Sequence, residues 1–236
     1  MKPICVVPAR GGSKRLPRKN IVELAGKPLV AWVIGAARES GIFAHVYVST
    51  EDDEIKAVAE RYGAEVPFRR PRDLAKDSVS AIKAAAHMVD TLCKRGERFG
   101  TVCISAPTVP LLTARDFCFA YELFRASGAD VLYSVCKMDE PPQWALKRSG
   151  RWLTPLFEEE SFEKESQDLE PAYRIVGGIQ FFRADHLRRN SNTYIADKMI
   201  GYVVRPEKGV EIDTEEDLRK ARYYLQRRVG REMESA

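Results

Sequence analysis

Short apolar runs alternate with longer amphipathic segments along most of this 236-residue chain, and this alternation constrains the fold more than any other feature. The runs predicted as strands are residues 4–7, 45–49, 101–105, 130–135, 178–182 and 200–204. The segments predicted as helices are residues 28–40, 51–62, 80–93, 113–127 and 214–228. Strands and helices in this order form βαβ units, so the sequence predicts an α/β fold with a mostly parallel sheet.

The composition is that of an ordinary globular protein, with 44% hydrophobic and 31% charged residues. A chain of this length suits one domain, and we assign residues 1–236 to it. The net charge of +4 is too small to indicate a nucleic-acid partner, and no apolar run approaches the ~20 residues of a membrane span. Five scattered cysteines without a C-x-x-C pair predict reduced thiols and a cytoplasmic location.

The regular alternation stops at residue 138. Residues 138–172 are rich in Pro, Glu, Lys and Ser, and they include Trp144, Trp152 and Phe157. This composition differs from that of the βα units on either side, so the segment is predicted to be an insertion that leaves the sheet. A small subdomain, a lid or a dimerisation arm each fits this pattern.

The first predicted strand leads into a loop with two adjacent glycines, Gly11 and Gly12, and several cations. These cations are Arg10, Lys14, Arg15, Arg18 and Lys19. Glycines let backbone amides approach a ligand closely, and amides and cations at a strand-to-helix turn suit a polyphosphate. Neither the Walker spacing nor the dinucleotide fingerprint is present, so we expect several side-chain cations to hold the phosphates. The alternative is a basic surface loop that only connects two elements.

Polar residues also follow other predicted strands, at residues 49–53, 107–108 and 211–213. Ligands of open α/β sheets bind at the carboxyl ends of the parallel strands. We therefore expect these segments and the basic loop to meet at one edge of the sheet.

Two carboxylates near the end of the chain, Glu211 and Asp213, are candidate metal ligands. In extended backbone they point to the same side. Two oxygen ligands close to bound phosphates suit Mg²⁺. The alternative is that they are helix-start charges favoured by the helix dipole, and this is our interpretation of Glu215 and Glu216.

Several motifs occur in order along the chain. The first is ICVVPARGGSK at residues 4–14, followed by PRKN at 17–20 and GKPL at 26–29. Later motifs are VSTED at 48–52, YGAEVPF at 62–68, SQDL at 166–169 and EIDTEEDL at 211–218. Together they resemble the acylneuraminate cytidylyltransferases, which include the CMP-sialic acid synthetases, over nearly the whole chain.

The resemblance implies a Rossmann-like, three-layer nucleotide-diphospho-sugar transferase fold and a homodimer. It also implies a reaction, in which the anomeric hydroxyl of a nine-carbon 2-keto acid sugar attacks the α-phosphorus of CTP. The products are a CMP-sugar and pyrophosphate, and Mg²⁺ is required. Such chemistry depends on alignment and on neutralised phosphate charge, which agrees with the basic loop.

The same resemblance assigns roles to individual residues. Residues implied to bind the nucleotide are Ala9, Arg10, Gly11, Gly12, Ser13, Lys14, Lys19, Asn20, Arg70 and Ser80. Among them, Asn20 reads the cytosine or its neighbourhood, and Arg70 and Ser80 lie by the nucleoside. The catalytic residues are Arg10, Lys19 and Asp213; Asp213 and Glu211 hold the metal. Gln167 and Arg174 are implied to bind the acid sugar, because a guanidinium matches a carboxylate.

The chain departs from the family pattern on the sugar side. Ala106 stands where relatives often have glutamine, Val176 where many have asparagine, and Glu165-Ser166 replaces a frequent arginine. The segments around Gln143 and Ser166 resemble the pseudaminic acid branch. We therefore expect pseudaminic or legionaminic acid before N-acetylneuraminate.

Two other functions remain open from the sequence. A cytidylyltransferase for 3-deoxy-manno-octulosonate shares the fold and a similar opening, but its relatives usually lack the Arg18-Lys19-Asn20 sequence. A non-catalytic module that grips RNA or phosphate is the other alternative. No aromatic stacking platform flanks the basic loop, which counts against RNA.

Overall fold

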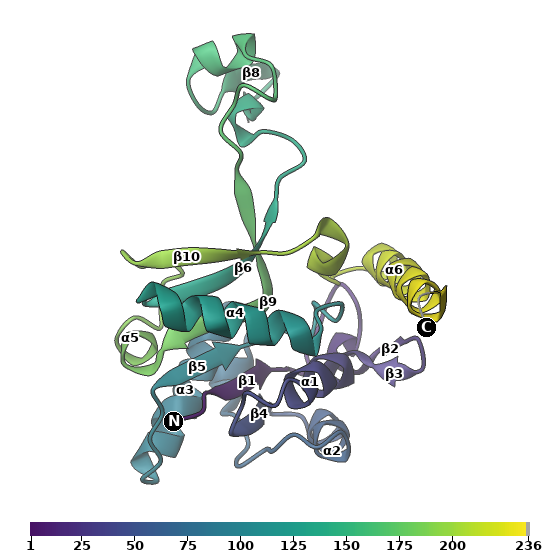
Figure 1. Cartoon of the computed structure of the whole chain (residues 1–236), viewed down its shortest axis with the longest axis vertical. Helices are drawn as coiled ribbons and strands as arrows, with labels where there is room; N and C mark the ends of the chain where they lie inside the picture. Colours follow the sequence, from purple (N-terminus) through teal and green to yellow (C-terminus); the bar gives the residue numbers. More distant parts are fainter. Residues whose placement is uncertain (235–236) are drawn as a thin grey trace.

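A six-stranded sheet in the order β10-β6-β9-β5-β1-β4 forms the centre of the protein (Figure 1). The computed structural model describes residues 1–234. The strands are β1 (Ile4–Pro8), β4 (His45–Ser49), β5 (Thr101–Ile104), β6 (Val131–Lys137), β9 (Tyr173–Arg183) and β10 (Met199–Val203). β1 pairs in parallel with β4 and β5, and β10 pairs in parallel with β6. The prediction of a mainly parallel α/β sheet is confirmed.

Strand β9 is the antiparallel exception, because it pairs antiparallel with both β5 and β6. The sequence predicted only a short strand at residues 178–182, and the observed strand is 11 residues long. The chain leaves the sheet at the end of β6 and returns beside that end, so β9 must run in the opposite direction.

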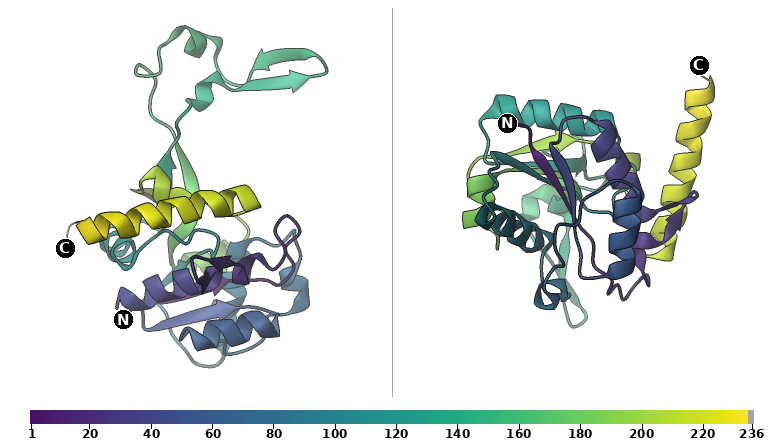
Figure 2. Two further views of the ribbon diagram at one scale, coloured as in Figure 1. Left: turned by 90° about the vertical axis from the view of Figure 1, so that its right-hand side faces the viewer. Right: turned by 90° about the horizontal axis from the view of Figure 1, so that it is seen from below.

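Helices cover both faces of the sheet, which gives three layers (Figure 2). One face packs against α1 (Leu29–Glu39), α2 (Asp53–Arg61) and α4 (Ala114–Ser127). The other face packs against α3 (Ala81–Lys94) and α5 (Ala184–Arg189). Alternate residues of β1 enter the two cores: Cys5 and Val7 face one, and Ile4 and Val6 face the other. A strand buried on both faces therefore reads as a continuous apolar run.

Helix starts follow the capping pattern of the sequence. Ser80 caps α3 by accepting a hydrogen bond from the Lys83 amide at 3.2 Å. Thr113 and Asp116 form a capping box at the start of α4. Residues predicted as helix from 51 begin instead at Asp53, because Asp52 is the N-cap and accepts from the Ile55 amide at 3.0 Å.

A third, smaller core joins the last helix, α6 (Glu215–Glu234), to the body. Leu218, Ala221 and Leu225 of α6 pack against a cluster that includes Leu24 of the β2 (Glu23–Leu24) and β3 (Lys27–Pro28) hairpin. This packing brings the segment before α6 next to the N-terminal loop. No helix within residues 1–234 has the length and hydrophobicity to cross a bilayer.

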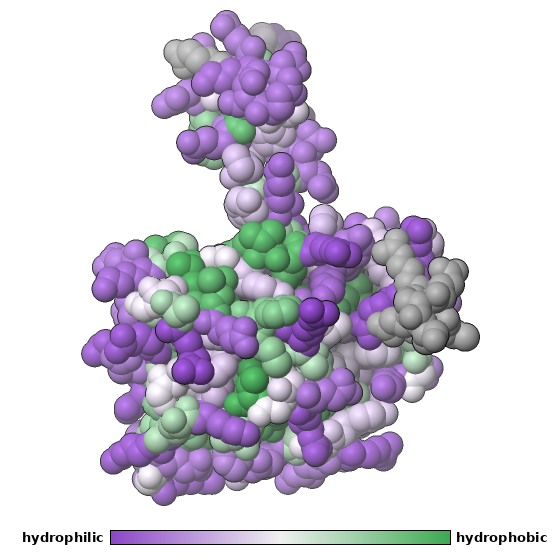
Figure 3. All heavy atoms as spheres, viewed as in Figure 1, coloured by the Kyte–Doolittle hydropathy of each residue, from purple (hydrophilic) through white to green (hydrophobic). Residues whose placement is uncertain are grey.

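The inserted segment forms an arm that projects from the body (Figures 1 and 2). The ends of β6 and β9 form its stalk, and a hairpin of β7 (Leu146–Ser149) and β8 (Trp152–Pro155) lies at its far end. Its other elements are η3 (Pro142–Trp144) and η4 (Glu159–Glu163). Trp152, Leu153 and Phe157 are 66%, 59% and 53% exposed. Figure 3 shows further apolar patches on the body near the base of the arm.

After α2, Glu65 forms an isolated parallel bridge with Tyr47. All five cysteines are free thiols, as expected, and Cys5, Cys103 and Cys136 are buried. Burial raises the pKa of the Cys136 thiol, so this side chain behaves as a small apolar core residue.

Candidate active site

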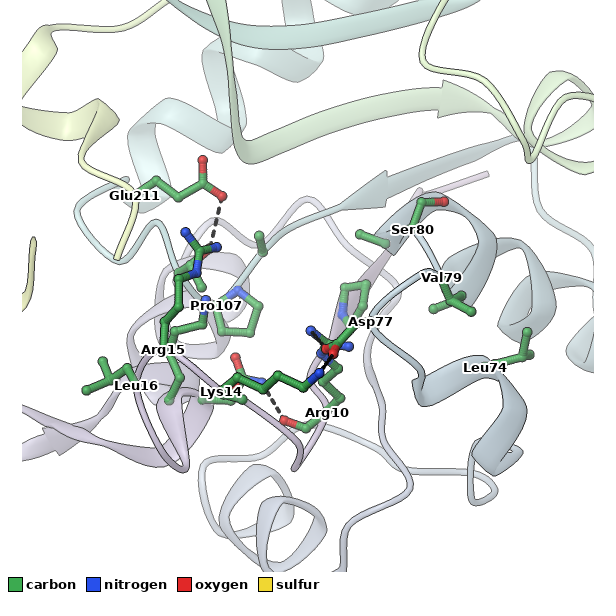
Figure 4. A pocket seen from close by; sticks show the side chains of 18 of the residues that line it. Arg10, Lys14, Arg15, Leu16, Leu74, Asp77, Val79, Ser80, Pro107 and Glu211 are labelled. Atoms are coloured by element: carbon green, nitrogen blue, oxygen red, sulfur yellow. Dashed lines mark hydrogen bonds and ion pairs between the residues drawn. The ribbon is translucent and has the colours of Figure 1, made fainter. Parts of the chain in front are cut away.

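A pocket of about 520 Å³ opens at the carboxyl ends of the parallel strands (Figure 4). The loop after β1 lines one side, the start of α3 lines another, and residues after β5 complete the wall together with Glu211. This is the predicted edge of the sheet, and the volume is sufficient for a nucleotide-sized ligand. Its lining includes the sequence-predicted residues Arg10, Ser13, Lys14, Lys19, Asn20, Arg70, Ser80 and Glu211.

The glycine loop is held by hydrogen bonds that its backbone amides donate to residues after β4 and at its end. The Gly11 amide donates to Glu51 Oε1 at 2.8 Å, and the Ala9 amide donates to the Ser49 carbonyl at 3.0 Å. A Cβ atom at Gly11 would lie 2.4 Å from Asp52 Oδ2, so a larger residue here would displace the Asp52 carboxylate. Gly12 has open space instead, which leaves room for a ligand beside the loop.

Asn20 closes the loop from the opposite end. Its side chain is buried, and its amide nitrogen donates to the Arg10 carbonyl at 2.8 Å. Asn20 therefore fixes the backbone that carries Arg10, while it also lines the pocket. A contact of Asn20 with cytosine stays a prediction.

An ion pair between Glu51 and Arg70 lies behind the loop. Arg70 Nη2 donates to Glu51 Oε2 at 2.7 Å, and Arg70 is only 4% exposed. Glu51 thus neutralises Arg70 through one oxygen and holds the Gly11 amide through the other. The sequence placed Glu51 at a strand end without a role. An acidic residue just after the carboxyl end of a parallel strand was the signal for it.

Four of the five loop cations face the pocket, where carboxylates neutralise them. Asp77 bridges Arg10 and Lys14, with both ion pairs at 2.7 Å. Asp213 bridges Lys19 at 2.6 Å and Arg15 at 2.7 Å. The basic loop is therefore charge-compensated at two separate points. A phosphate group, like these carboxylates, offers negatively charged oxygen acceptors to such cations.

The fifth cation, Arg18, is not among the residues that line the pocket. It donates to Asp52 Oδ2 at 2.5 Å and also pairs with Glu54, at the start of α2. The hydrogen bond from Arg18 lowers the pKa of Asp52, and the same bond raises the pKa of Arg18. Arg18 has a left-handed backbone with a φ of 55°, which directs the chain into the next turn.

Glu211 and Asp213 show the predicted alternation of polar and apolar residues, because the buried Ile212 lies between these two more exposed carboxylates. Ile212 is buried, and its amide donates to the Thr108 carbonyl at 2.8 Å, which fixes the segment beside the pocket. Glu211 lines the pocket and accepts from Thr108 Oγ1 at 3.4 Å, while Asp213 contacts Lys19. The N-terminal loop and the C-terminal carboxylates, almost two hundred residues apart, therefore meet at one site.

Glu211 and Asp213 are the carboxylates that would hold a metal ion shared with a nucleotide, and both Asp213 oxygens are paired here with Lys19 and Arg15. Mg²⁺ in such sites takes one or two carboxylates and completes its coordination with phosphate oxygens and water. Among residues 1–234, no group of three or more acidic, His or Cys side chains forms a protein-only metal site. Mg²⁺ binding stays a prediction, and the donor set supports a site that includes substrate oxygens.

The two residues predicted to bind the sugar lie outside the pocket of this chain. Gln167 belongs to the arm, and Arg174 lies in the stalk, where its Nη2 donates to the Gly209 carbonyl at 3.1 Å.

The structure places Tyr194 nearer the site, beside Ser80 and Glu211. Burial and the charge of Glu211 raise the pKa of the Tyr194 phenol, and a hydrogen bond with Ser80 opposes this shift. No sequence pattern marked Tyr194, because it lies in an irregular loop.

Comparison with known proteins identifies related sequences. Residues 4–130 match the family model described as Cytidylyltransferase. The chain is 38% identical to a pseudaminic acid cytidylyltransferase of Campylobacter jejuni, over 77% of this chain and 78% of that one. It is 34% identical to the CMP-N,N'-diacetyllegionaminic acid synthase of Legionella pneumophila, over 82% and 83% of the two chains. N-acylneuraminate cytidylyltransferase A of Danio rerio is 30% identical, over 89% of this chain but only 47% of that one.

Solved structures show the same fold. A CMP:2-keto-3-deoxy-manno-octonic acid synthetase complexed with CTP superposes with a TM-score of 0.71 at 19% identity, covering 97% of this chain and 100% of that one. A 4-diphosphocytidyl-2C-methyl-D-erythritol synthase has a TM-score of 0.67 at 13% identity, covering 95% of this chain and 100% of that one. These structures show the fold, and the family model and the relatives above show that the chain belongs to the cytidylyltransferase family.

Proposed function

We propose that this protein transfers CMP from CTP to the anomeric hydroxyl of a nine-carbon 2-keto acid sugar. The sugar oxygen forms a bond to the α-phosphorus, the bond from that phosphorus to the bridging oxygen breaks, and pyrophosphate leaves. The observation that carries the proposal is the ion pair between Lys19 and Asp213 at 2.6 Å, which lies beside the cluster of loop cations.

Within this proposal, the chain acts by alignment and by electrostatic stabilisation. Arg10 and Lys14 hold the outer phosphates, and Lys19 neutralises charge on the group that is transferred. Glu51 and Asn20 keep the loop in the conformation that presents these cations. Glu211 and Asp213 would hold Mg²⁺, which adds positive charge at the phosphates when bound.

We expect pseudaminic or legionaminic acid as the sugar. The C. jejuni and L. pneumophila relatives carry these names, and both are more similar to this chain than the D. rerio N-acylneuraminate enzyme. Ala106 lines the pocket where relatives often have a glutamine, so a side-chain amide is missing on that wall. A different pattern of sugar substituents would compensate for this loss.

A substrate panel tests the proposal. Purified protein is mixed with CTP, Mg²⁺ and one sugar at a time: pseudaminic, legionaminic, N-acetylneuraminic or 3-deoxy-manno-octulosonic acid. Pyrophosphate release is expected with pseudaminic or legionaminic acid and not without sugar. Release with 3-deoxy-manno-octulosonate alone would support the other cytidylyltransferase reaction. No turnover with any sugar, together with salt-sensitive RNA binding, would support the binding module.

We also propose that the protein is a cytoplasmic homodimer held together by the arm. Exposed Trp152, Leu153 and Phe157 on a projecting segment favour burial against a second copy. In such a dimer Gln167 is carried toward the other copy's pocket, which would account for its distance from its own. The CTP substrate and five free thiols support the reducing cytoplasm.

Sedimentation velocity tests the dimer. Trp152→Glu is expected to convert a wild-type dimer into monomers, because it places a charge in the apolar contact. Tyr223→Glu is the matched control, since Tyr223 is 52% exposed on α6 rather than on the arm. A wild-type monomer, or a dimer that Trp152→Glu leaves intact, would contradict the role of the arm.

A further inference from the structure

The Asp77 carboxylate lies where the basic loop would otherwise present two free cations to a ligand. It contacts Arg10 Nη2 and Lys14 Nζ, each at 2.7 Å, and Figure 4 shows the three side chains pointing toward one another in the pocket. Asp77 itself lines the pocket. Arg10 and Lys14 are the residues whose position after the first strand indicates a phosphate site.

The turn that carries Asp77 is tied to the pocket wall. The Val79 amide donates to the Lys76 carbonyl at 3.0 Å, and Ser80 then caps α3. Val79 and Ser80 line the pocket immediately after this turn. Helix α3 therefore fixes the place of the carboxylate, and a ligand in the pocket meets the same segment directly.

Displacement of Asp77 leaves Arg10 in position. Arg10 Nη1 also donates to the Ala75 carbonyl at 3.3 Å, and the buried Asn20 holds the Arg10 backbone. An entering phosphate can thus replace the Asp77 contacts without rebuilding the loop. The hydrogen bond from Lys14 and the charge of Arg10 lower the pKa of Asp77, so the carboxylate is ionised at neutral pH and repels a phosphate beside it.

From this geometry we propose that Asp77 is a displaceable counter-ion, which competes with the phosphates of CTP and with product pyrophosphate for Arg10 and Lys14. The inference rests on the proposed function, because it takes the pocket to be the triphosphate site. Asp77 keeps the two cations paired when the pocket is empty. It also weakens the binding of pyrophosphate, because the carboxylate can form ion pairs with both cations again as the product leaves.

Binding of inorganic pyrophosphate, measured by isothermal titration calorimetry without sugar, tests the competition directly. Asp77→Asn removes the charge at nearly constant volume, at a side chain that is 47% exposed. We expect roughly tenfold tighter pyrophosphate binding, since two partly exposed ion pairs no longer have to be broken and a repulsive charge is gone. CTP binding is expected to strengthen in the same direction.

Asp73→Asn is the matched control. Asp73 is 86% exposed on the same segment and pairs with Lys76, so the Asp73→Asn variant is expected to bind pyrophosphate as tightly as the wild type. A second test combines Asp77→Asn with Lys14→Ala. The increase in pyrophosphate affinity caused by Asp77→Asn must be smaller in the Lys14→Ala background, because one of the two competing ion pairs has already been removed.

Unchanged or weaker pyrophosphate binding by Asp77→Asn would overturn the proposal and make Asp77 a residue that positions the cations. An equal gain with Asp73→Asn would also overturn it, because the effect would then be one of net charge. The binding assay needs no turnover. If the wild type synthesises a CMP-sugar but Asp77→Asn does not bind pyrophosphate more tightly, only the counter-ion role of Asp77 is rejected. If Asp77→Asn binds pyrophosphate more tightly but the wild type synthesises no CMP-sugar, only the sugar reaction is rejected.

Discussion

Replacing Asp213 by asparagine distinguishes a role in catalysis from a role at the start of α6. The structure allows the cost in stability to be estimated. Asp213 pairs with Lys19 at 2.6 Å and with a largely exposed Arg15, and its own side chain is 32% exposed. Partly exposed pairs are worth up to about 1 kcal/mol, and the Arg15 pair adds little after screening by solvent. We therefore expect a loss of about 1 kcal/mol, or roughly 2–4 °C in Tm.

The expected loss of activity is much larger. Asparagine cannot supply the negative charge that holds Lys19 and would bind Mg²⁺, so charge stabilisation at the transferred phosphate weakens. Removal of a single group of this kind commonly lowers turnover by about 10²-fold. Asp213→Asn is thus predicted to retain its fold and lose its reaction.

The assay compares initial rates of pyrophosphate release with melting curves of the same preparations. Asp217→Ala is the control, since Asp217 accepts hydrogen bonds from the Asp213 and Thr214 amides at 3.1 and 2.9 Å and acts as a helix-start acid. It should lose about 1 kcal/mol of stability with a smaller effect on turnover. If Asp213→Asn and Asp217→Ala lose stability and activity in the same proportion, Asp213 is only a helix-start residue and the reasoning is refuted.

Three further changes test other parts of the site. Lys19→Ala should raise the KM for CTP or lower kcat by at least tenfold in steady-state kinetics, and unchanged kinetics would remove Lys19 from the site. Glu51→Gln should lower the free energy of unfolding in urea by about 3 kcal/mol, because Arg70 remains buried without its counter-charge; a loss below 1 kcal/mol would contradict this. Lys208→Met should lower the free energy of unfolding at pH 7. Its difference in free energy of unfolding from the wild type should narrow as the pH falls below the ordinary aspartate pKa of about 3.9, which denaturation at several pH values measures.

The sign of the last effect follows from the pKa of Asp116. Burial raises this pKa, but hydrogen bonds from Lys208 and Thr113 outweigh burial and lower it overall. A carboxyl with a lowered folded pKa contributes stability above its unfolded pKa, and this contribution is lost as pH falls through the folded pKa. Lys208 Nζ lies 2.6 and 2.8 Å from the Asp116 oxygens, so the lysine matters only while the carboxylate is ionised.

Much of the fold was predictable because local patterns and tertiary structure agree. The β1 run is apolar since it is buried on both faces, and the caps at Ser80 and Thr113 occur where the sequence predicts helix starts. The direction of β9 was not predictable in this way. It depends on where the arm returns to the sheet, and no residue within the strand encodes that.

The candidate site was predictable as a meeting of segments but not as a set of contacts. The loops after β1 and β5 open at the same edge of the sheet, and the segment after β10 brings Glu211 to them through the hydrogen bond from the Ile212 amide to the Thr108 carbonyl. Which cation faces the ligand depends on loop backbone: Arg18 turns away at a left-handed φ, although its sequence neighbour Lys19 turns inward. The spacing of charges alone contains no such information.

The carboxylates that pair with the loop explain why a cluster of cations is compatible with a folded pocket. Four like charges around one cavity repel one another, and each becomes more costly as the cavity excludes water. Asp77 and Asp213 each lie between two of them, so the repulsion is removed without a ligand. Because both carboxylates are partly exposed, their hold on the cations is weak enough for phosphates to replace them. A buried pair such as Glu51 and Arg70 cannot be exchanged in this way, and it accordingly supports the loop rather than the ligand.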